Sequence, residues 1–139
     1  MPRKATSHPK PAADARKTRG ARLRTHVRVM LEDEIALGPG KTDLLEAIRD
    51  TGSISAGGKQ LGMSYRRAWL LVDAMNRCFK APLVTTSAGG VAGGGARLTA
   101  TGADVLQRYR ALEKAVAAAT ETGFNDLRPY LRKTPQPPA

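Results

Sequence analysis

Residues 52–79, GSISAGGKQLGMSYRRAWLLVDAMNRCF, constrain the fold most, because they predict two short helices joined by a tight turn. The first helix, over 53–61, can be capped by its leading serine, whose hydroxyl accepts an early backbone N–H. Gly62 can end it in the left-handed conformation that glycine tolerates. Ser64 can cap the second helix, over 64–79. The apolar stripe of that helix, at helical spacing, comprises Ala68, Leu71, Val72, Met75 and Phe79. Two such helices are typical of a helix-turn-helix, whose second helix enters the major groove of DNA.

The glycine-rich stretch that follows, VTTSAGGVAGGGARLT (84–99), predicts a β-hairpin next to the second helix, that is, a wing. Its glycines allow positive φ angles and a close approach of backbone to a phosphate strand. A Walker phosphate loop is excluded, because Gly95 stands where that motif needs its lysine. The spacing of a dinucleotide fingerprint is absent as well. The alternative that the glycines form only a flexible connection stays open.

The flanking segments complete a mainly α fold with a small β component, a winged helix-turn-helix. Alternating residues over 23–30 predict a strand. A short amphipathic helix is expected over 42–50, started by Thr42 or Lys41 and ended by Gly52. A longer, alanine-rich helix is expected to start at a Thr101 cap.

The long helix carries more apolar surface than one small core needs, which favours a dimer. The residues expected in the dimer interface are Val105, Tyr109, Leu112 and Val116. The alternative is that this stripe packs back on the helix expected over 42–50. We expect residues 22–120 to form the DNA-binding domain, dimerisation helix included, and residues 121–139 to form a partly disordered extension.

The positive charge of the chain is concentrated at its N-terminus. Residues 1–28 hold nine Lys and Arg against one acidic residue, out of 23 basic and 12 acidic residues in all. We expect residues 1–21 to be a disordered basic arm, because this composition cannot bury enough apolar surface to fold. Such an arm suits polyanions, with DNA favoured over acidic membrane. Without a run of 18 apolar residues or a secretory signal, the chain is expected to be cytoplasmic and nucleoid-associated.

Enzymatic and metal chemistry have little support in the sequence. Cys78 is the single cysteine, and His8 and His26 are the only histidines, so neither an internal disulfide nor a Cys/His zinc cluster is possible. No carboxylate pair or activated nucleophile stands out. We therefore expect no catalysis, cofactor or metal, and we expect Cys78 to be a small buried apolar group.

The residues expected to contact DNA lie at helix starts and on the wing. Arg66, in the first turn of the second helix with Tyr65 and Arg67, is the first choice for bidentate bonding to guanine. The expected backbone contacts are Ser53, Ser55, Lys59, Ser64, Arg97, Thr99 and Thr101. Trp69 borders both faces of its helix and is expected in the core. The alternative for the arginines is a solvated, exposed face.

Together, the GSIS, GMSYRRAW and VDAMN motifs and the glycine-rich wing leading into ARLT resemble the DNA-binding domain of the ModE family of molybdenum-responsive bacterial regulators. The resemblance covers residues 23–118 and implies a winged helix-turn-helix that binds operator DNA as a two-fold dimer. LysR-type regulators are more distantly similar. The chain ends at Ala139 without the molbindin-like domains of that family, so molybdate is not expected to bind it. Gly57 and Gly58 replace the family's small helix formers, at a cost of about 1 kcal/mol each.

The sequence is therefore compatible with three alternative functions. The leading one is a sequence-specific, dimeric transcriptional regulator of double-stranded DNA, acting on molybdenum-related genes. The second is a non-specific architectural DNA-binding protein driven by the basic arm. The third is an oxyanion-binding protein.

Overall fold

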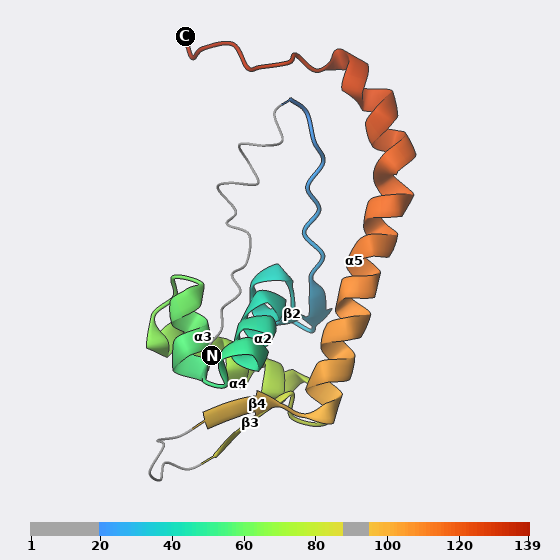
Figure 1. The fold of residues 1–139 in the computed structure, drawn as a ribbon. Coiled ribbons are helices and arrows are strands. Elements are labelled where there is room, and N and C mark those ends of the chain that lie inside the picture. The colour runs from blue at the N-terminus through green and yellow to red at the C-terminus, as the bar shows by residue number, and fades with distance from the viewer. Residues whose placement is uncertain (1–19, 88–94) are drawn as a thin grey trace. The chain divides into compact units, whose positions relative to one another are not determined.

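The structure, a computed structural model, describes residues 20–87 and 95–139. It divides into two units: residues 25–116 form the larger one, and the two ends of the chain form the smaller one. Nearly all of the expected basic arm, and the centre of the glycine-rich stretch, fall outside the described residues. The larger unit carries the helices and strands of the expected fold (Figure 1).

The described residues form helices and short strands. In chain order the elements are β1 (Val29–Leu31), β2 (Glu34–Leu37), α2 (Pro39–Thr51), α3 (Ile54–Gln60), α4 (Tyr65–Cys78), β3 (Val84–Ser87), β4 (Gly95–Leu98), α5 (Ala100–Leu127) and a 3-10 helix, η1 (Arg128–Tyr130). Strands β1 and β2 form one antiparallel pair, and β3 and β4 form another. Helix α5 continues beyond residue 120, where we expected the DNA-binding domain to end.

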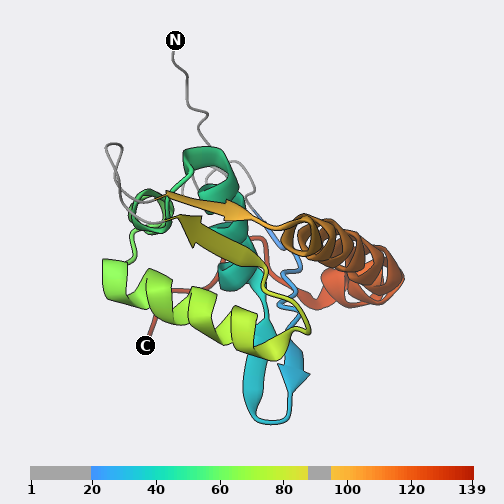
Figure 2. The same cartoon turned by 90° about the horizontal axis from the view of Figure 1, so that it is seen from below.

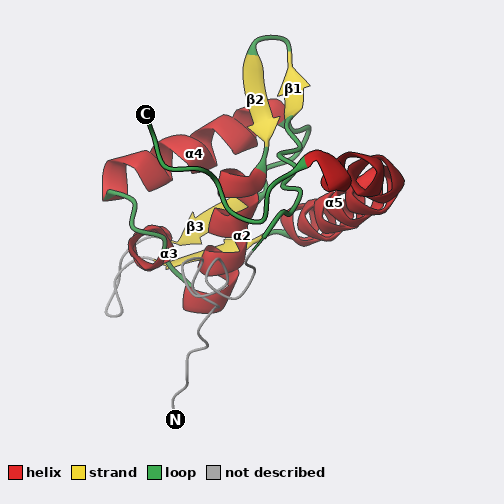
Figure 3. Ribbon diagram, turned by 90° about the horizontal axis from the view of Figure 1, so that it is seen from above, coloured by secondary structure: helices red, strands yellow, loops and turns green. Residues whose placement is uncertain are grey.

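The strand expected over 23–30 was wrong in extent, because only its end, within Val29–Leu31, pairs. The chain turns back within two residues, and the partner strand β2 ends at Leu37, which already lies opposite Val29. Pro39 then begins α2, so no strand lies beside the residues before β1. Figure 3 shows this hairpin at the end of α4 that lies away from α3.

Helix α2 begins earlier than the expected range of 42–50. Pro39 occupies its first turn, where the missing N–H costs nothing and the fixed φ of proline suits the helix. Thr42 is instead inside the helix, fully buried, and its hydroxyl donates a hydrogen bond to the Gly38 carbonyl. Gly52 ends the helix as expected, with a φ of 76° that other residues rarely adopt.

Helices α3 and α4 begin as the sequence predicts. The Ser53 hydroxyl accepts a hydrogen bond from the Ala56 amide at 3.0 Å, and the Ser64 hydroxyl accepts one from the Arg67 amide at 3.1 Å. Gly62 lies in the turn between the helices with a φ of 74°. The two caps and the turn confirm the predicted helix-turn-helix.

Two glycines in α3 let that helix lie against both of its neighbours. A Cβ at Gly57 would lie 3.1 Å from the Ile48 amide nitrogen of α2, and a Cβ at Gly58 would lie 2.8 Å from the Ala68 Cβ of α4. Both distances are shorter than ordinary van der Waals contact. The close packing of three helices thus offsets the helix propensity that the glycines cost.

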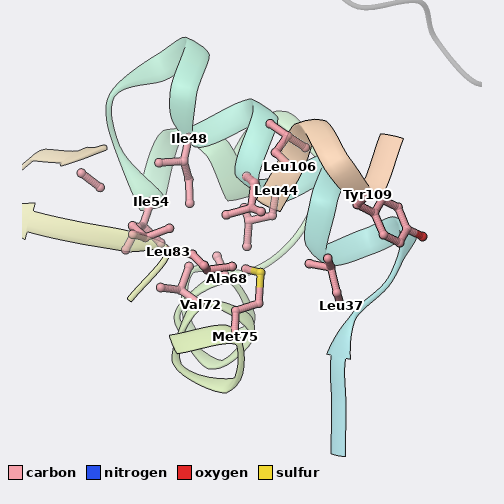
Figure 4. Close-up of a cluster of buried hydrophobic side chains, with 13 residues drawn as sticks. Leu37, Leu44, Ile48, Ile54, Ala68, Val72, Met75, Leu83, Leu106 and Tyr109 are labelled. Carbon is pink, nitrogen blue, oxygen red and sulfur yellow. The ribbon is translucent and has the colours of Figure 1, made fainter. Parts of the chain in front are cut away.

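The core of the larger unit receives side chains from every helix and from both sheets (Figure 4). Its buried members are Leu37, Leu44, Leu45, Ile48, Ile54, Ala68, Val72, Met75, Leu83, Val84, Ala96, Leu106 and Tyr109. The inward stripe predicted for α4 is confirmed at Ala68, Val72 and Met75. Phe79 and Cys78, at the end of that helix, are only half-buried, so the expectation of a buried Cys78 holds in part.

Helix α5 is capped by Thr99, and the expected cap at Thr101 was wrong. The Thr99 hydroxyl accepts a hydrogen bond from the Gly102 amide at 2.9 Å and donates one to the Pro82 carbonyl at 2.7 Å. Thr101 lies within the first turn of the helix and is exposed. The first turn lies so close to the preceding segment that a Cβ at Gly102 would overlap the Leu83 carbonyl oxygen.

The inner face of α5 packs on the core of its own chain. Tyr109, which we expected in a dimer interface, is only 2% exposed, and its hydroxyl donates a hydrogen bond to the Val27 carbonyl at 2.7 Å. Val105 is partly buried against the same core. Of the four residues expected in the interface, Leu112 is exposed and Val116 is half-buried. The dimer prediction therefore depends on these two alone.

Ion pairs join α5 to α2. Arg110 bonds Asp43 at 2.9 Å and Glu46 at 2.9 Å, and it also bonds Glu113 of its own helix at 2.8 Å. Burial lowers the pKa of Arg110, but hydrogen bonds to the three carboxylates outweigh it, so the net shift of the pKa is upward. Packing of this stretch of α5 on α2, the alternative left open by the sequence, is what the structure shows.

The buried Tyr109 makes stability depend on pH at the alkaline end. Burial raises the pKa of its hydroxyl above the ordinary value of 10.0. The folded state therefore favours the neutral hydroxyl of Tyr109. The stability that this preference contributes is fully present below about pH 10 and is lost as the pH rises through the folded-state pKa. We expect the free energy of unfolding, measured by urea denaturation, to fall more steeply above pH 10 in the wild type than in Tyr109→Phe. The exposed Tyr65 gives the matched control, Tyr65→Phe, and equal slopes in all three proteins would contradict the prediction.

Candidate nucleic-acid interface

The starts of α3 and α4 and the wing strands meet on one side of the larger unit (Figure 2). A shallow groove between them is lined by Ser53, Ser55, Tyr65, Trp69 and Thr86, among others. Each helix start also presents backbone N–H groups, which attract anions. The structure thus brings three of the predicted contact residues, from two helices, to one groove beside the wing.

The wing is fixed to the helix-turn-helix at two points. The Ala96 amide of β4 donates a hydrogen bond to the Gly52 carbonyl, between α2 and α3, at 2.9 Å. The Asn76 carboxamide of α4 accepts hydrogen bonds from the Leu83 and Val84 amides at 2.8 and 3.3 Å and donates one to the Val84 carbonyl at 3.1 Å. Asn76 of α4 therefore holds the wing in position.

The wing prediction is confirmed at its strands. Residues in β3 pair with β4 in register from Val84 opposite Leu98 to Ser87 opposite Gly95. The tip, residues 88–94, lies outside the described residues, so its contact with a phosphate strand stays a prediction.

Arg66 faces directly away from the core. It lies about 200° around α4 from the fully buried Ala68 and is itself exposed. Arg67, Lys59 and Arg97 are also exposed. Within residues 20–87 and 95–139, no ion pair or side-chain hydrogen bond engages the charged groups of these four residues. Their positive charges are therefore available to a bound anion.

By contrast, the positive charge at the C-terminal end of α4 is neutralised by ion pairs. Arg77 binds Glu34 of β2 through two hydrogen bonds of 3.0 Å and binds Asp73 at 2.9 Å. The hydrogen bond from Arg77 lowers the pKa of Glu34, so this carboxylate stays ionised to lower pH than usual. The outward face of α4 is thus basic at its start and charge-paired at its end.

Several predicted contacts have internal roles. The hydroxyls of Ser53 and Ser64 cap their helices, and the hydroxyl of Thr99 caps α5. Thr99 and Thr101 follow β4 at the start of α5, and Thr99 lies about 13 Å along the strand from Gly95 at the groove. The structure does not bring these two threonines to the groove.

Trp69 is not a core residue, contrary to the expectation. Its side chain is 38% exposed, and its ring meets that of Tyr65 edge-on, with centroids 6.2 Å apart. Trp69 lies on the side of α4 that borders the open groove, so no other helix covers its ring. Thr85 and Thr86 of β3, which the sequence analysis passed over, are exposed beside the same side of the wing. Their hydroxyls, in the first arm of the predicted hairpin just before the glycine run that begins at Gly89, were the signal that could have found them.

Other kinds of site find no support in the described residues. No group of three or more His, Cys, Asp or Glu side chains that could hold a metal ion occurs in this part of the chain. Among the helices described, none has the length and apolar character needed to cross a membrane.

Known proteins similar to this chain have molybdenum-related names. The chain is 48% identical over 81 residues to the molybdenum-pterin-binding protein MopB of Rhodobacter capsulatus, and 42% identical over 88 residues to the molybdenum transport protein ModE of Azotobacter vinelandii. It is 39% identical over 96 residues to the DNA-binding transcriptional dual regulator ModE of Escherichia coli K12. This chain is homologous to the ModE regulators. The resemblance seen in the sequence is thereby confirmed.

The homology to ModE covers part of each relative. The three matches include 58%, 62% and 69% of this chain but 30%, 33% and 37% of the relatives, so the chain spans about a third of their length. No protein-family model matches the chain.

The fold is shared with a solved DNA-binding domain. The structure of the CbnR DNA-binding domain in complex with DNA matches 64% of this chain and 97% of its own, with a TM-score of 0.52 and 19% sequence identity. At this identity the similarity shows the fold alone. It confirms the winged helix-turn-helix with a long C-terminal helix.

Proposed function

We propose that this chain is a sequence-specific DNA-binding regulator in which α4 enters the major groove and the wing contacts the backbone. The observation that carries the proposal is the start of α4. There Arg66 and Arg67 are exposed and make no ion pair among the described residues, on a helix whose opposite face is fully buried. The homology to ModE and the shared fold support the same function.

The geometry suits base recognition by the helix and backbone contact by its surroundings. The major groove admits one α-helix, and an outward arginine can donate two hydrogen bonds to the O6 and N7 atoms of guanine. Ser55 and Lys59 of α3 and Arg97 of β4 are exposed and would contact phosphates. The anchors at Gly52 and Asn76 hold the wing in a fixed relation to α4, so both can engage one duplex together.

A two-fold dimer acting on molybdenum-related genes completes the proposal. Leu112, which is 41% exposed on α5, gives apolar surface for such a dimer. The names of the relatives associate them with molybdenum, which is why we place the regulated genes there. Dimeric winged helix proteins read half-sites about one helical turn apart, so the operator should be a palindrome.

Selection of bound DNA from a random duplex pool tests the function. We expect enrichment of one palindromic motif with half-sites about 34–36 Å apart from centre to centre. The selected duplex should bind at least about 1,000-fold more tightly than random DNA at moderate salt. A pool that remains random after repeated rounds would contradict the proposal and favour the architectural alternative.

A further inference from the structure

The two ends of the chain carry most of its net positive charge. Residues 1–24 and 117–139 hold eleven basic and three acidic side chains, whereas residues 25–116 hold twelve basic and nine acidic ones. The fold that contains α4 is therefore nearly balanced. The described part of the smaller unit, residues 20–24 and 117–139, holds five basic and two acidic side chains, to which the mechanism proposed above gives no role.

The described part of the smaller unit gathers basic groups from both ends of the sequence. Arg22 and Arg24 line one surface hollow together with Tyr130, Arg132 and Lys133. Segments more than one hundred residues apart in the sequence thus contribute to one surface. We name Arg22, Arg24, Arg132 and Lys133 the terminal basic cluster.

The cluster is open to solvent. Its four basic residues are exposed, and Tyr130 beside them is 86% exposed. Within the described residues, Arg24, Arg132 and Lys133 make no ion pair with a carboxylate. The cations of Arg24, Arg132 and Lys133 line one hollow without a carboxylate partner among the described residues, so they repel each other and a bound polyanion would relieve the repulsion.

We propose that the terminal basic cluster is a second DNA-binding surface, which contacts the phosphate backbone of duplex DNA without regard to sequence. The choice of DNA as the polyanion rests on the proposed function of the larger unit. The four residues of the cluster lie outside helices and strands, so no helix or strand carries them into a groove, and we expect phosphate contacts that add affinity rather than specificity. An acidic membrane surface is the rival source of phosphate groups, and the experiment separates the two.

The test compares the salt dependence of binding to a random-sequence duplex. Each phosphate contact lowers the slope of log affinity against log salt by about 0.9, so the full-length double variant Arg132→Gln/Lys133→Gln should have a slope shallower by about 2. The ratio of affinities for the selected and random duplexes should stay unchanged. Because the slope is measured on random DNA, it tests the cluster even if α4 shows no sequence preference.

Lys80→Gln/Lys114→Gln is the matched control. Both lysines are exposed in the larger unit, and this variant loses the same two charges. We expect its slope to stay within about 0.5 of the wild-type slope, because general charge effects are screened at moderate salt. Equal slopes for the two double variants would overturn the proposal. It would also be overturned if the cluster variant lost binding to phosphatidylserine vesicles but kept its DNA slope.

Discussion

Replacing Gly102 by alanine is expected to destabilise the larger unit by about 3 kcal/mol or more. The new Cβ would overlap the Leu83 carbonyl oxygen and lie 2.9 Å from the carbonyl carbon. That carbonyl cannot easily retreat, because it accepts a hydrogen bond from the Thr99 amide at 2.9 Å, and the Leu83 amide is held by Asn76. Overpacking typically costs about 1–3 kcal/mol, and the obstacle here is backbone rather than a flexible side chain. Urea denaturation and the melting temperature measure the loss.

Gly123→Ala on the same helix is the matched control. A Cβ at Gly123 would meet no atom within 4 Å, and the residue is exposed. Alanine should therefore stabilise α5 by up to about 1 kcal/mol through its higher helix propensity. If Gly102→Ala were as stable as Gly123→Ala, the first turn of α5 could not lie against the segment before β3.

The helix-turn-helix could be predicted because its signals are local. Ser53 and Ser64 each cap the helix that begins immediately after them, and their hydroxyls reach amides three residues on. Gly52 and Gly62 take the left-handed conformation where the sequence marks a helix end. The buried stripe of α4 follows from the helical period alone.

The environment of a side chain could not be predicted in the same way. Periodicity shows that Tyr109 lies on the inner face of α5, but not whether its own chain or a second copy covers that face. The segment that receives its hydrogen bond lies 82 residues earlier in the sequence, at Val27. The periodicity of α4 likewise leaves Trp69 at a boundary, and only the open groove beside the wing decides its exposure.

The candidate site was predictable where exposure alone matters. Arg66 is outward on α4 as the helical period requires, and Arg67 beside it is also exposed. Asn76 and Arg77 share the same helix, yet one fastens the wing and the other pairs with Glu34, 43 residues away. No spacing within α4 signals these partners, because they come from strands placed by the tertiary fold.

Arg66→Ala is expected to remove the preference for guanine at one position of the operator while leaving the fold intact. Loss of a bidentate contact to guanine costs about 1–3 kcal/mol, which corresponds to an affinity for the selected duplex about 5- to 150-fold lower. Binding to random DNA should fall only slightly, since a single charge contributes little to the non-specific term. The ratio of the two affinities, measured by fluorescence anisotropy at one salt concentration, therefore falls. Repeated selection with the variant should show the loss at the guanine position alone.

Arg77→Ala separates base recognition from loss of charge. Arg77 lies on the same outward face of α4, but its guanidinium is already bonded to Glu34 and Asp73. Its removal should leave the affinity ratio near that of the wild type, because that charge is committed to the protein. If both variants lowered the ratio equally, α4 would act through its charge and not through contacts to particular bases. If neither variant changed the affinity ratio, residues outside this face of α4 would recognise the DNA sequence. The proposed placement of α4 in the major groove would then be wrong.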